Sequence, residues 1–181
     1  MAREVVVKDV DYTGKYRQYW NYVNEDSSLH KGSCCGQAAV YSVLRTINPK
    51  KFTGSFQSFV EKNPPNMLFG TLGTSRERIL QTFRKHGFKA SKGEYETPLR
   101  IRLLHGPVVV CLDVGATGDY GKGIGGWGLH WVAVFGYTHS HYQITNWNGG
   151  TRLSHEKFRK AWNTSLTSAA AWSSCEYYYP H

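Results

Sequence analysis

The spacing of apolar positions changes from helical to strand-like along the chain. Between Val40 and Ile47, apolar residues recur at intervals of three and four, which predicts a helix over Cys35–Ile47 with a core-facing stripe. Pro49 lies beyond its end. Shorter helices are predicted at Ser55–Glu61, from Thr74 to His86, from Pro98 to His105 and from Ser154 through Ala161.

Two of the shorter helices are delimited by residues that start or end helices. Thr74, followed by Glu77 three residues later, forms a capping box, and Gly87 fits the position after the end of that helix. Pro98 can open the next helix, which Gly106 ends. The first half of the chain is therefore predicted to be mostly helical.

Strand patterns dominate the second half. Buried or alternating apolar runs predict strands at Pro107–Val114, Leu129–Tyr137, His141–Trp147 and Ser174–Tyr179. A turn at Thr138–Ser140 joins the second and third of these strands. Because helices and strands are segregated, the sequence predicts an α+β fold with an antiparallel sheet. The length of 181 residues, without repeats or low-complexity linkers, predicts one domain over residues 1–181.

The chain carries a strong positive charge. Lys and Arg number 22 against 13 Asp and Glu, a formal net charge of +9. A basic, soluble surface accounts for this charge, and attraction to an anionic partner such as nucleic acid or cell wall is the alternative. No known nucleic-acid-binding module accompanies the basic residues, so we expect no nucleic-acid partner.

Long hydrophobic segments are missing from the sequence. No run approaches the ~18 apolar residues of a transmembrane helix. Residues 1–11 lack the apolar segment of ~7–15 residues found in signal peptides. We therefore expect no membrane span, and a location in the cytoplasm of the producing cell or, for a delivered effector, in a target cell. We also expect a monomer.

The cysteines do not form a pattern typical of disulfides or zinc. Cys34 and Cys35 are adjacent, whereas Cys111 and Cys175 lie far from them and from each other. The sequence contains no Cys-x-x-Cys pair, and Cys111, inside an apolar run, is expected to be buried. We therefore expect no metal and no other cofactor.

Cys35 stands at the predicted start of the first long helix. There the unpaired N–H groups and the positive end of the helix are expected to lower the thiol pKa and favour the nucleophilic thiolate. A backbone N–H at this position can also bind an oxyanion. Gly36, the next residue, lets a substrate backbone approach closely.

A thiol nucleophile needs a base, and the base needs a group that orients it. His130 lies at the start of the second predicted strand and Asn146 near the end of the third. If these strands form a hairpin, both residues lie at its open end. In an ideal hairpin they are not directly opposite, so a bulge or an offset turn is required to bring them together.

Three motifs that contain these residues follow one another along the chain. They are C-G-Q-A-A-V from Cys35, G-L-H-W-V-A-V-F-G-Y over 128–137 and I-T-N-W over 144–147. In this order they resemble papain-superfamily cysteine peptidases, most closely the branch similar to bacteriocin-leader-processing peptidases. A short helix that ends in a Gly-Pro turn before a central strand adds to the resemblance, which covers roughly residues 15–150.

The resemblance implies a papain-like fold, in which a helical half with the nucleophile helix packs on an antiparallel sheet half. It implies that Cys35 is the nucleophile, that His130 is the general base and acid, and that Asn146 orients the imidazole. Many members of the leader-processing branch have Asp at this third position, whereas papain has Asn. Asn148 is the alternative to Asn146. The implied activity is hydrolysis of a peptide or protein substrate through a Cys-His-Asn triad, without a cofactor.

The oxyanion donor departs from the family pattern, and the choice of nucleophile between two adjacent cysteines is undecided. The family places a Gln shortly before the Cys, where it donates to the oxyanion, but the ten residues before Cys35 contain none. Gln18 is the best candidate, with an ordinary surface amide as the alternative, and Gln37 is expected to point elsewhere. Cys34 competes with Cys35, although the Cys-Gly pairing favours Cys35. Cys34 is then either a packed neighbour or half of a redox-labile vicinal disulfide.

Two further classes of function remain open from the sequence. The same triad serves a papain-fold acyl transferase, a deamidase or a cell-wall amidase, and the positive charge suits an anionic cell wall. A non-catalytic binding module for an anionic partner is the other alternative. The presence of both Cys and His disfavours that module.

Overall fold

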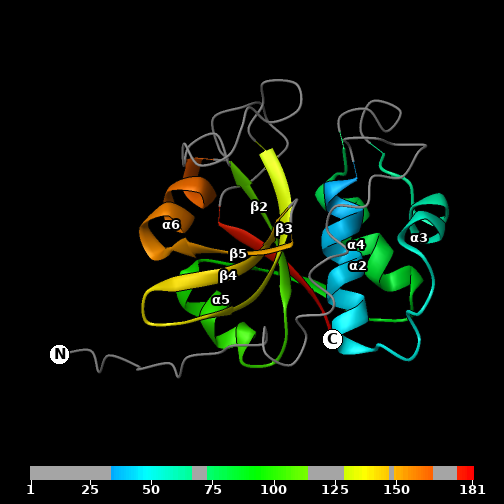
Figure 1. The fold of residues 1–181 in the computed structure, drawn as a ribbon, viewed down its shortest axis with the longest axis horizontal. Helices are drawn as coiled ribbons and strands as arrows, with labels where there is room; N and C mark the ends of the chain where they lie inside the picture. Colours follow the sequence, from blue (N-terminus) through cyan, green and yellow to red (C-terminus); the bar gives the residue numbers. More distant parts are fainter. Residues whose placement is uncertain (1–33, 67–72, 114–128, 147–148, 165–174) are drawn as a thin grey trace.

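The computed structural model describes residues 34–66, 73–113, 129–146, 149–164 and 175–181. Within them the chain forms a six-stranded antiparallel sheet with the strand order β1-β6-β2-β3-β4-β5 (Figure 1). The helices are α2 (Cys35–Ile47), α3 (Phe56–Lys62), α4 (Arg76–Lys85), α5 (Glu96–Leu103) and α6 (His155–Thr164). The strands are β1 (Ala90–Glu94), β2 (Val108–Asp113), β3 (Leu129–Tyr137), β4 (His141–Asn146), β5 (Gly149–Ser154) and β6 (Glu176–Pro180).

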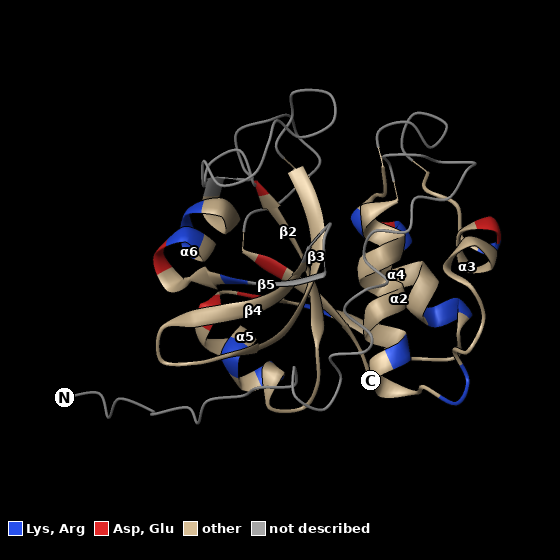
Figure 2. Cartoon of the chain, in the orientation of Figure 1, with Lys and Arg blue, Asp and Glu red and all other residues tan. Residues whose placement is uncertain are grey.

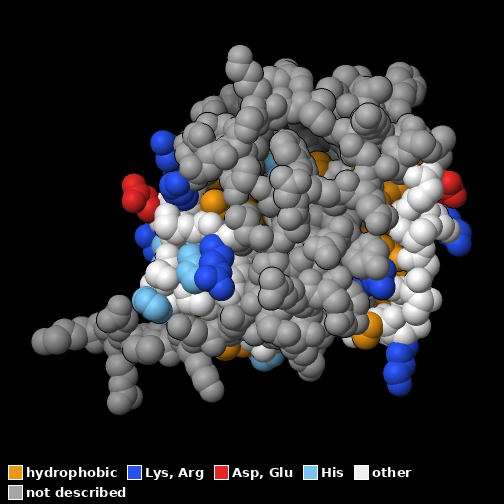
Figure 3. All heavy atoms as spheres, viewed as in Figure 1, with side chains coloured by type: hydrophobic (Ala, Val, Ile, Leu, Met, Phe, Trp, Pro, Cys, Tyr) orange, Lys and Arg blue, Asp and Glu red, His pale blue; other side chains and the backbone are white. Residues whose placement is uncertain are grey.

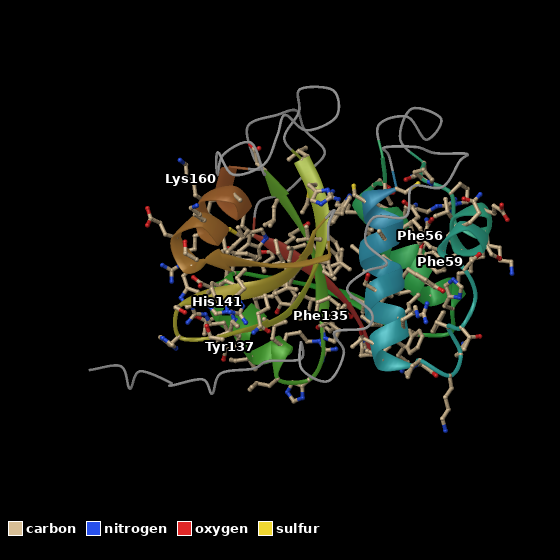
Figure 4. All side chains as sticks on the ribbon, in the orientation of Figure 1. Phe56, Phe59, Phe135, Tyr137, His141 and Lys160 are labelled. Atoms are coloured by element: carbon tan, nitrogen blue, oxygen red, sulfur yellow. The ribbon has the colours of Figure 1, made fainter. Side chains whose placement is uncertain are left out.

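The sheet separates two hydrophobic cores. On one face, α2, α3 and α4 pack against alternate residues of β3 from Trp131 to Phe135. Phe135 lies between β3 and α2, whereas Phe56 and Phe59 belong to α3 and contact the ring of Tyr41 in α2 (Figure 4). On the other face, α5 and α6 cover the intervening residues of β3, such as Val132. This division follows from the period of two along a strand, which sends successive side chains to opposite faces.

Helix α2 is buried on nearly all sides because it lies between the sheet and the other helices of its half. The buried hydroxyls of Ser42 and Thr46 are satisfied within the helix, whereas Tyr41 OH donates to Gly54 O outside it. Ser42 Oγ donates to Ala38 O at 2.8 Å and Thr46 Oγ1 donates to Ser42 O at 2.7 Å. The helix can therefore pass through the core without leaving these polar groups unpaired.

The predicted α+β class and most predicted elements are confirmed. The bounds of α2 and β3 are those predicted. The Oγ of Ser154 accepts from Lys157 N at 3.2 Å and so caps α6, which continues to Thr164. The segregation of helices and strands along the chain is thus realised in the fold.

The start of α4 differs from the prediction. Ser75, and not Thr74, is its N-cap, and the Oγ of Ser75 accepts from Arg78 N at 3.2 Å. Thr74 lies one residue earlier, and its hydroxyl donates to Gln37 Oε1 at 2.7 Å. Thr74, predicted to cap α4, therefore contacts a residue of α2 that is far from it in the sequence.

Two edge strands, β1 and β5, were not predicted. Their sequences, A-S-K-G-E and G-G-T-R-L-S, lack a run of apolar alternation. Strand β1 pairs only with β6, and β5 only with β4, among the described strands. At Gly93 in β1, an added Cβ would lie 2.2 Å from Cζ of Tyr177, so the ring of Tyr177 covers the glycine. Such strands are defined by their partners rather than by their own pattern.

Candidate active site

The beginnings of α2 and β3 lie at the same end of the molecule, the upper end in Figure 1. Cys35 is the first residue of α2 and His130 is the second residue of β3. The thiol of Cys35 is hydrogen-bonded by the backbone of Trp131, the residue that follows His130. The structure therefore brings the start of the helix against the start of the strand, as the proposed chemistry requires.

Burial raises the pKa of the Cys35 thiol. Backbone hydrogen bonds from Trp131 and from Gly36 lower it, but the loss of water outweighs them, and the neighbouring Cys34 raises it further. The direction is opposite to the one expected for a thiol at a helix start. Because burial dominates, a positive charge beside the sulfur is needed for the thiolate to form near neutral pH.

His130 is buried, with 2% of its surface exposed. In the ladder between β2 and β3, His130 pairs with Leu112, and the next pair is Cys111 with Trp131. It therefore lies in a rigid, paired part of the sheet, whose backbone is fixed on the β2 side.

A β-bulge decides where Asn146 falls in the sheet. The register between β3 and β4 shifts between Val134 and Gly136, from Gly136↔Gln143 to Val134↔Ile144. In the shifted register Ile144, two residues before Asn146, lies across from Val134, in the alternation that includes His130. Without the shift, Asn146 would fall in the opposite alternation. Asn146 itself pairs with Gly149 in β5.

The neighbouring cysteines are free thiols with different surroundings. Cys34 is buried in the hydrophobic core, with 4% exposure, whereas Cys35 is partly exposed. Cys111 is buried in the same core, as predicted, and burial raises its thiol pKa far above the ordinary value. Of the pair, Cys35 is thus the residue that is not fully buried.

Thr74 lies beside the candidate site, and the sequence did not single it out as part of that site. Trp131 is buried, its Nε1–H donates to Thr74 O at 2.8 Å, and its ring contacts Tyr178 edge-on. The amide oxygen of Gln37 accepts from Thr74, so Gln37 points toward α4, as expected. No sequence signal identifies Thr74, because its partners are distant in the chain.

Several predicted residues lie outside the described part of the structure or are described only by their backbone. Gln18 and Asn148 are outside the described residues. Asn146 is described as the last residue of β4. Among the described residues, no group of three or more metal-binding side chains is found, and no helix is long and apolar enough to cross a membrane.

The positive charge is concentrated in the helical half. Residues 34–89 contain nine Lys or Arg and two acidic residues, and the basic residues gather around the ends of α2 and α4 (Figure 2). Lys51 Nζ donates to His86 O at 2.6 Å and Lys85 Nζ donates to Lys62 O. These lysines therefore neutralise the carbonyl ends of helices. On the visible face, described Lys and Arg side chains also project at the margins (Figure 3).

The fold of this chain is similar to that of several solved structures. Neither a protein-family model nor a curated protein matches the sequence. Among solved structures, the peptidase domain of Streptococcus ComA, a bifunctional ABC transporter in a quorum-sensing pathway, is 19% identical with a TM-score of 0.59, over 89% of this chain and 97% of that domain. A Bacillus anthracis protein described as a C39-like peptidase is 14% identical with a TM-score of 0.61, over 96% and 98%.

A second kind of cysteine protease is also similar to this chain in fold. The Carica candamarcensis cysteine protease CMS1MS2, solved with E-64, is 15% identical with a TM-score of 0.55, over 91% of this chain and 95% of that enzyme. The chain has the papain-like fold. In this papain-like chain, β2, β3 and β4 lie inside the sheet, between β6 and β5.

Proposed function

We propose that this papain-like chain is a single cysteine peptidase domain that hydrolyses an amide bond in a peptide or protein. Cys35 is the nucleophile, His130 the general base and acid, and Asn146 the residue that orients the imidazole. Gln18 is proposed to donate to the oxyanion. The proposal needs no metal or cofactor.

One observation carries this proposal. The thiol at the start of α2 is hydrogen-bonded by the backbone of Trp131, next to His130 in β3. The register shift between Val134 and Gly136 supports the third assignment, because a ladder continued in the shifted register would align Asn146 with the alternation that includes His130. The likeness to solved cysteine peptidases, at 14–19% sequence identity, supports the papain-like fold on which these roles rest.

The reaction follows from these roles. His130 takes the proton of the Cys35 thiol, and the sulfur attacks the carbonyl carbon to form a tetrahedral adduct. As the adduct collapses, the carbon–nitrogen bond breaks and the imidazolium gives its proton to the leaving amine. Water, deprotonated by His130, then cleaves the thioester, which releases the acid and regenerates the thiol.

Site-resolved labelling with iodoacetamide across pH tests the pair directly. Burial by itself raises the pKa of Cys35, so an isolated thiol here should label slowly at pH 7. If His130 supplies the positive charge, Cys35 labels rapidly at pH 7, and His130→Ala slows this labelling by ~100-fold or more. Cys175, a partly exposed thiol, is the internal reference. Labelling of Cys35 that matches Cys175 and ignores His130→Ala would contradict the proposal.

A peptide-library assay then tests the reaction itself. Wild-type protein should cleave a subset of peptides, and Cys35→Ser should abolish cleavage. Cys34→Ser is the matched control, because it removes the neighbouring thiol without removing the proposed nucleophile. Loss of activity in Cys34→Ser alone, with Cys35→Ser active, would assign the nucleophile to Cys34. Transfer of the acyl group to an added amine in place of water would indicate acyl transfer.

A further inference from the structure

Thr74 makes three contacts that join the two halves of the molecule. Its Oγ1–H donates to Gln37 Oε1 at 2.7 Å, in the first turn of α2. Its carbonyl oxygen accepts from Trp131 Nε1 at 2.8 Å, on β3. Its side chain packs on Gly36, where an added Cβ would lie 2.6 Å from Thr74 Cβ. Thr74, Gln37 and Trp131 are each 2–3% exposed, so these contacts are shielded from water.

These contacts close a ring around the proposed nucleophile. Starting at Cys35, the ring runs along α2 to Gln37, crosses to Thr74, and continues through the indole of Trp131 to the Trp131 backbone, which hydrogen-bonds to the Cys35 thiol. Every link is either covalent or a buried hydrogen bond. The start of α2 is therefore tied to the start of β3 by one residue that belongs to neither element.

We propose that Thr74 is a positioning residue, which sets the separation between the Cys35 thiol and the start of β3 where His130 lies. It acts through Gln37 on the helix side and through Trp131 on the strand side. This inference rests on the proposed function, because it concerns the geometry of that Cys–His pair. Proton transfer and attack depend steeply on such separations, and a displacement of about 1 Å can cost ~100-fold in rate.

The hydroxyl of Thr74 is the part that can be removed alone. Thr74→Val keeps the branched shape that packs on Gly36 and the carbonyl that accepts from Trp131, but it leaves Gln37 Oε1 without its donor. Thr74→Ser keeps the donor and loses only a methyl group. Trp131→Phe keeps a ring and removes the other hydrogen bond. The three variants therefore separate the two links of the ring.

The test is the pH profile of Cys35 labelling in the full chain. Thr74→Val and Trp131→Phe are each expected to slow labelling at pH 7 by ~10–100-fold and to move the midpoint of its pH dependence upward. Thr74→Ser is expected to restore most of the wild-type rate. Thr82→Val is the matched control: Thr82 is also buried in the helical half, and its Oγ1 donates to Arg78 O at 2.7 Å, away from the ring.

The outcomes separate this inference from the proposed function. An activated wild-type Cys35 that is unchanged in Thr74→Val overturns the role of Thr74 and leaves the Cys–His pair intact. Equal slowing by Thr82→Val and Thr74→Val also overturns it, because general loosening of the helical half would then explain both. A wild-type Cys35 that labels like Cys175 overturns both proposals together.

Discussion

Gly36 illustrates how a single position near the site is constrained by packing. A Cβ at this residue would lie 2.6 Å from Thr74 Cβ and 2.8 Å from Thr74 Oγ1. From the sequence, Gly36 was expected to let a substrate backbone approach closely. The structure adds a second requirement, because the absence of a side chain lets Thr74 contact the first turn of α2.

Gly36→Ala is therefore expected to destabilise the protein by ~1–3 kcal/mol, as overpacking does in a filled core. The favourable helix propensity of alanine offsets part of this cost. Gly54→Ala is the control, since nothing lies within 4 Å of an added Cβ there. Urea unfolding of both variants measures the difference, and an unfolding midpoint for Gly36→Ala equal to that of Gly54→Ala would refute the packing argument.

Asn146 is the residue whose proposed role depends most on the fold. Asn146→Ala should reduce peptide cleavage more than it reduces Cys35 labelling at high pH, where the thiolate forms without help from an oriented imidazole. Asn146→Asp should retain more activity than Asn146→Ala, because a carboxylate accepts from the imidazole N–H and also stabilises the imidazolium. Asn148→Ala is the comparison, and a larger loss in Asn148→Ala would move the assignment to that residue.

At the scale of elements, a cluster of polar side chains ties α5 to β4 and α6. Glu96 in α5 accepts from Arg100 Nη2 at 2.7 Å, from Tyr142 OH at 2.8 Å and from Arg159 Nε at 2.6 Å. These partners lower the pKa of Glu96 against the opposing effect of burial. One carboxylate thus holds three elements of the sheet half together.

Glu96→Ala is expected to cost ~1–3 kcal/mol of unfolding free energy, because it leaves partly buried donors without their acceptor. Glu94→Ala is the matched control: its ion pair with Lys92 at 3.4 Å is exposed, and such pairs contribute ~0–1 kcal/mol. Chemical denaturation monitored by Trp fluorescence compares the two. A loss for Glu96→Ala no greater than that for Glu94→Ala would show that the cluster is not a structural tie.

For the whole molecule, two histidines link stability to pH. Burial lowers the pKa of His155, and the charge of Arg100 lowers it further. Burial likewise lowers the pKa of His86, with added repulsion from Lys85, Lys51 and Lys62. Below the ordinary histidine pKa of ~6.5, the unfolded chain therefore binds protons that the folded chain does not.

Stability is accordingly expected to fall as pH decreases from ~6.5 toward 5, before the glutamates titrate. The double variant His86→Gln/His155→Gln should flatten this part of the stability profile. Urea unfolding at several pH values checks the slope, and a wild-type profile that is flat between pH 6.5 and 5 would contradict the assignment.

Local sequence patterns predicted the main elements because those elements carry their own signals. The apolar stripe of α2, the apolar run of β3 and the capping serine of α6 act within a few residues of each other. Motif order along the chain was also sufficient to predict a papain-like fold. Strands β1 and β5 carried no such signal, since polar edge strands are stabilised by the strand beside them.

Local sequence patterns were sufficient for most elements, for the fold class and for the residue types at the candidate site. Packing of the elements set the surroundings of those residues. The bulge in β3 shifted the register of β4, the strand that ends at Asn146. Burial reversed the expected shift in the Cys35 pKa. Thr74, predicted as a helix cap, instead forms contacts with both α2 and β3. The physical reason is shared: register, desolvation and contacts between distant residues arise only when separate elements pack together.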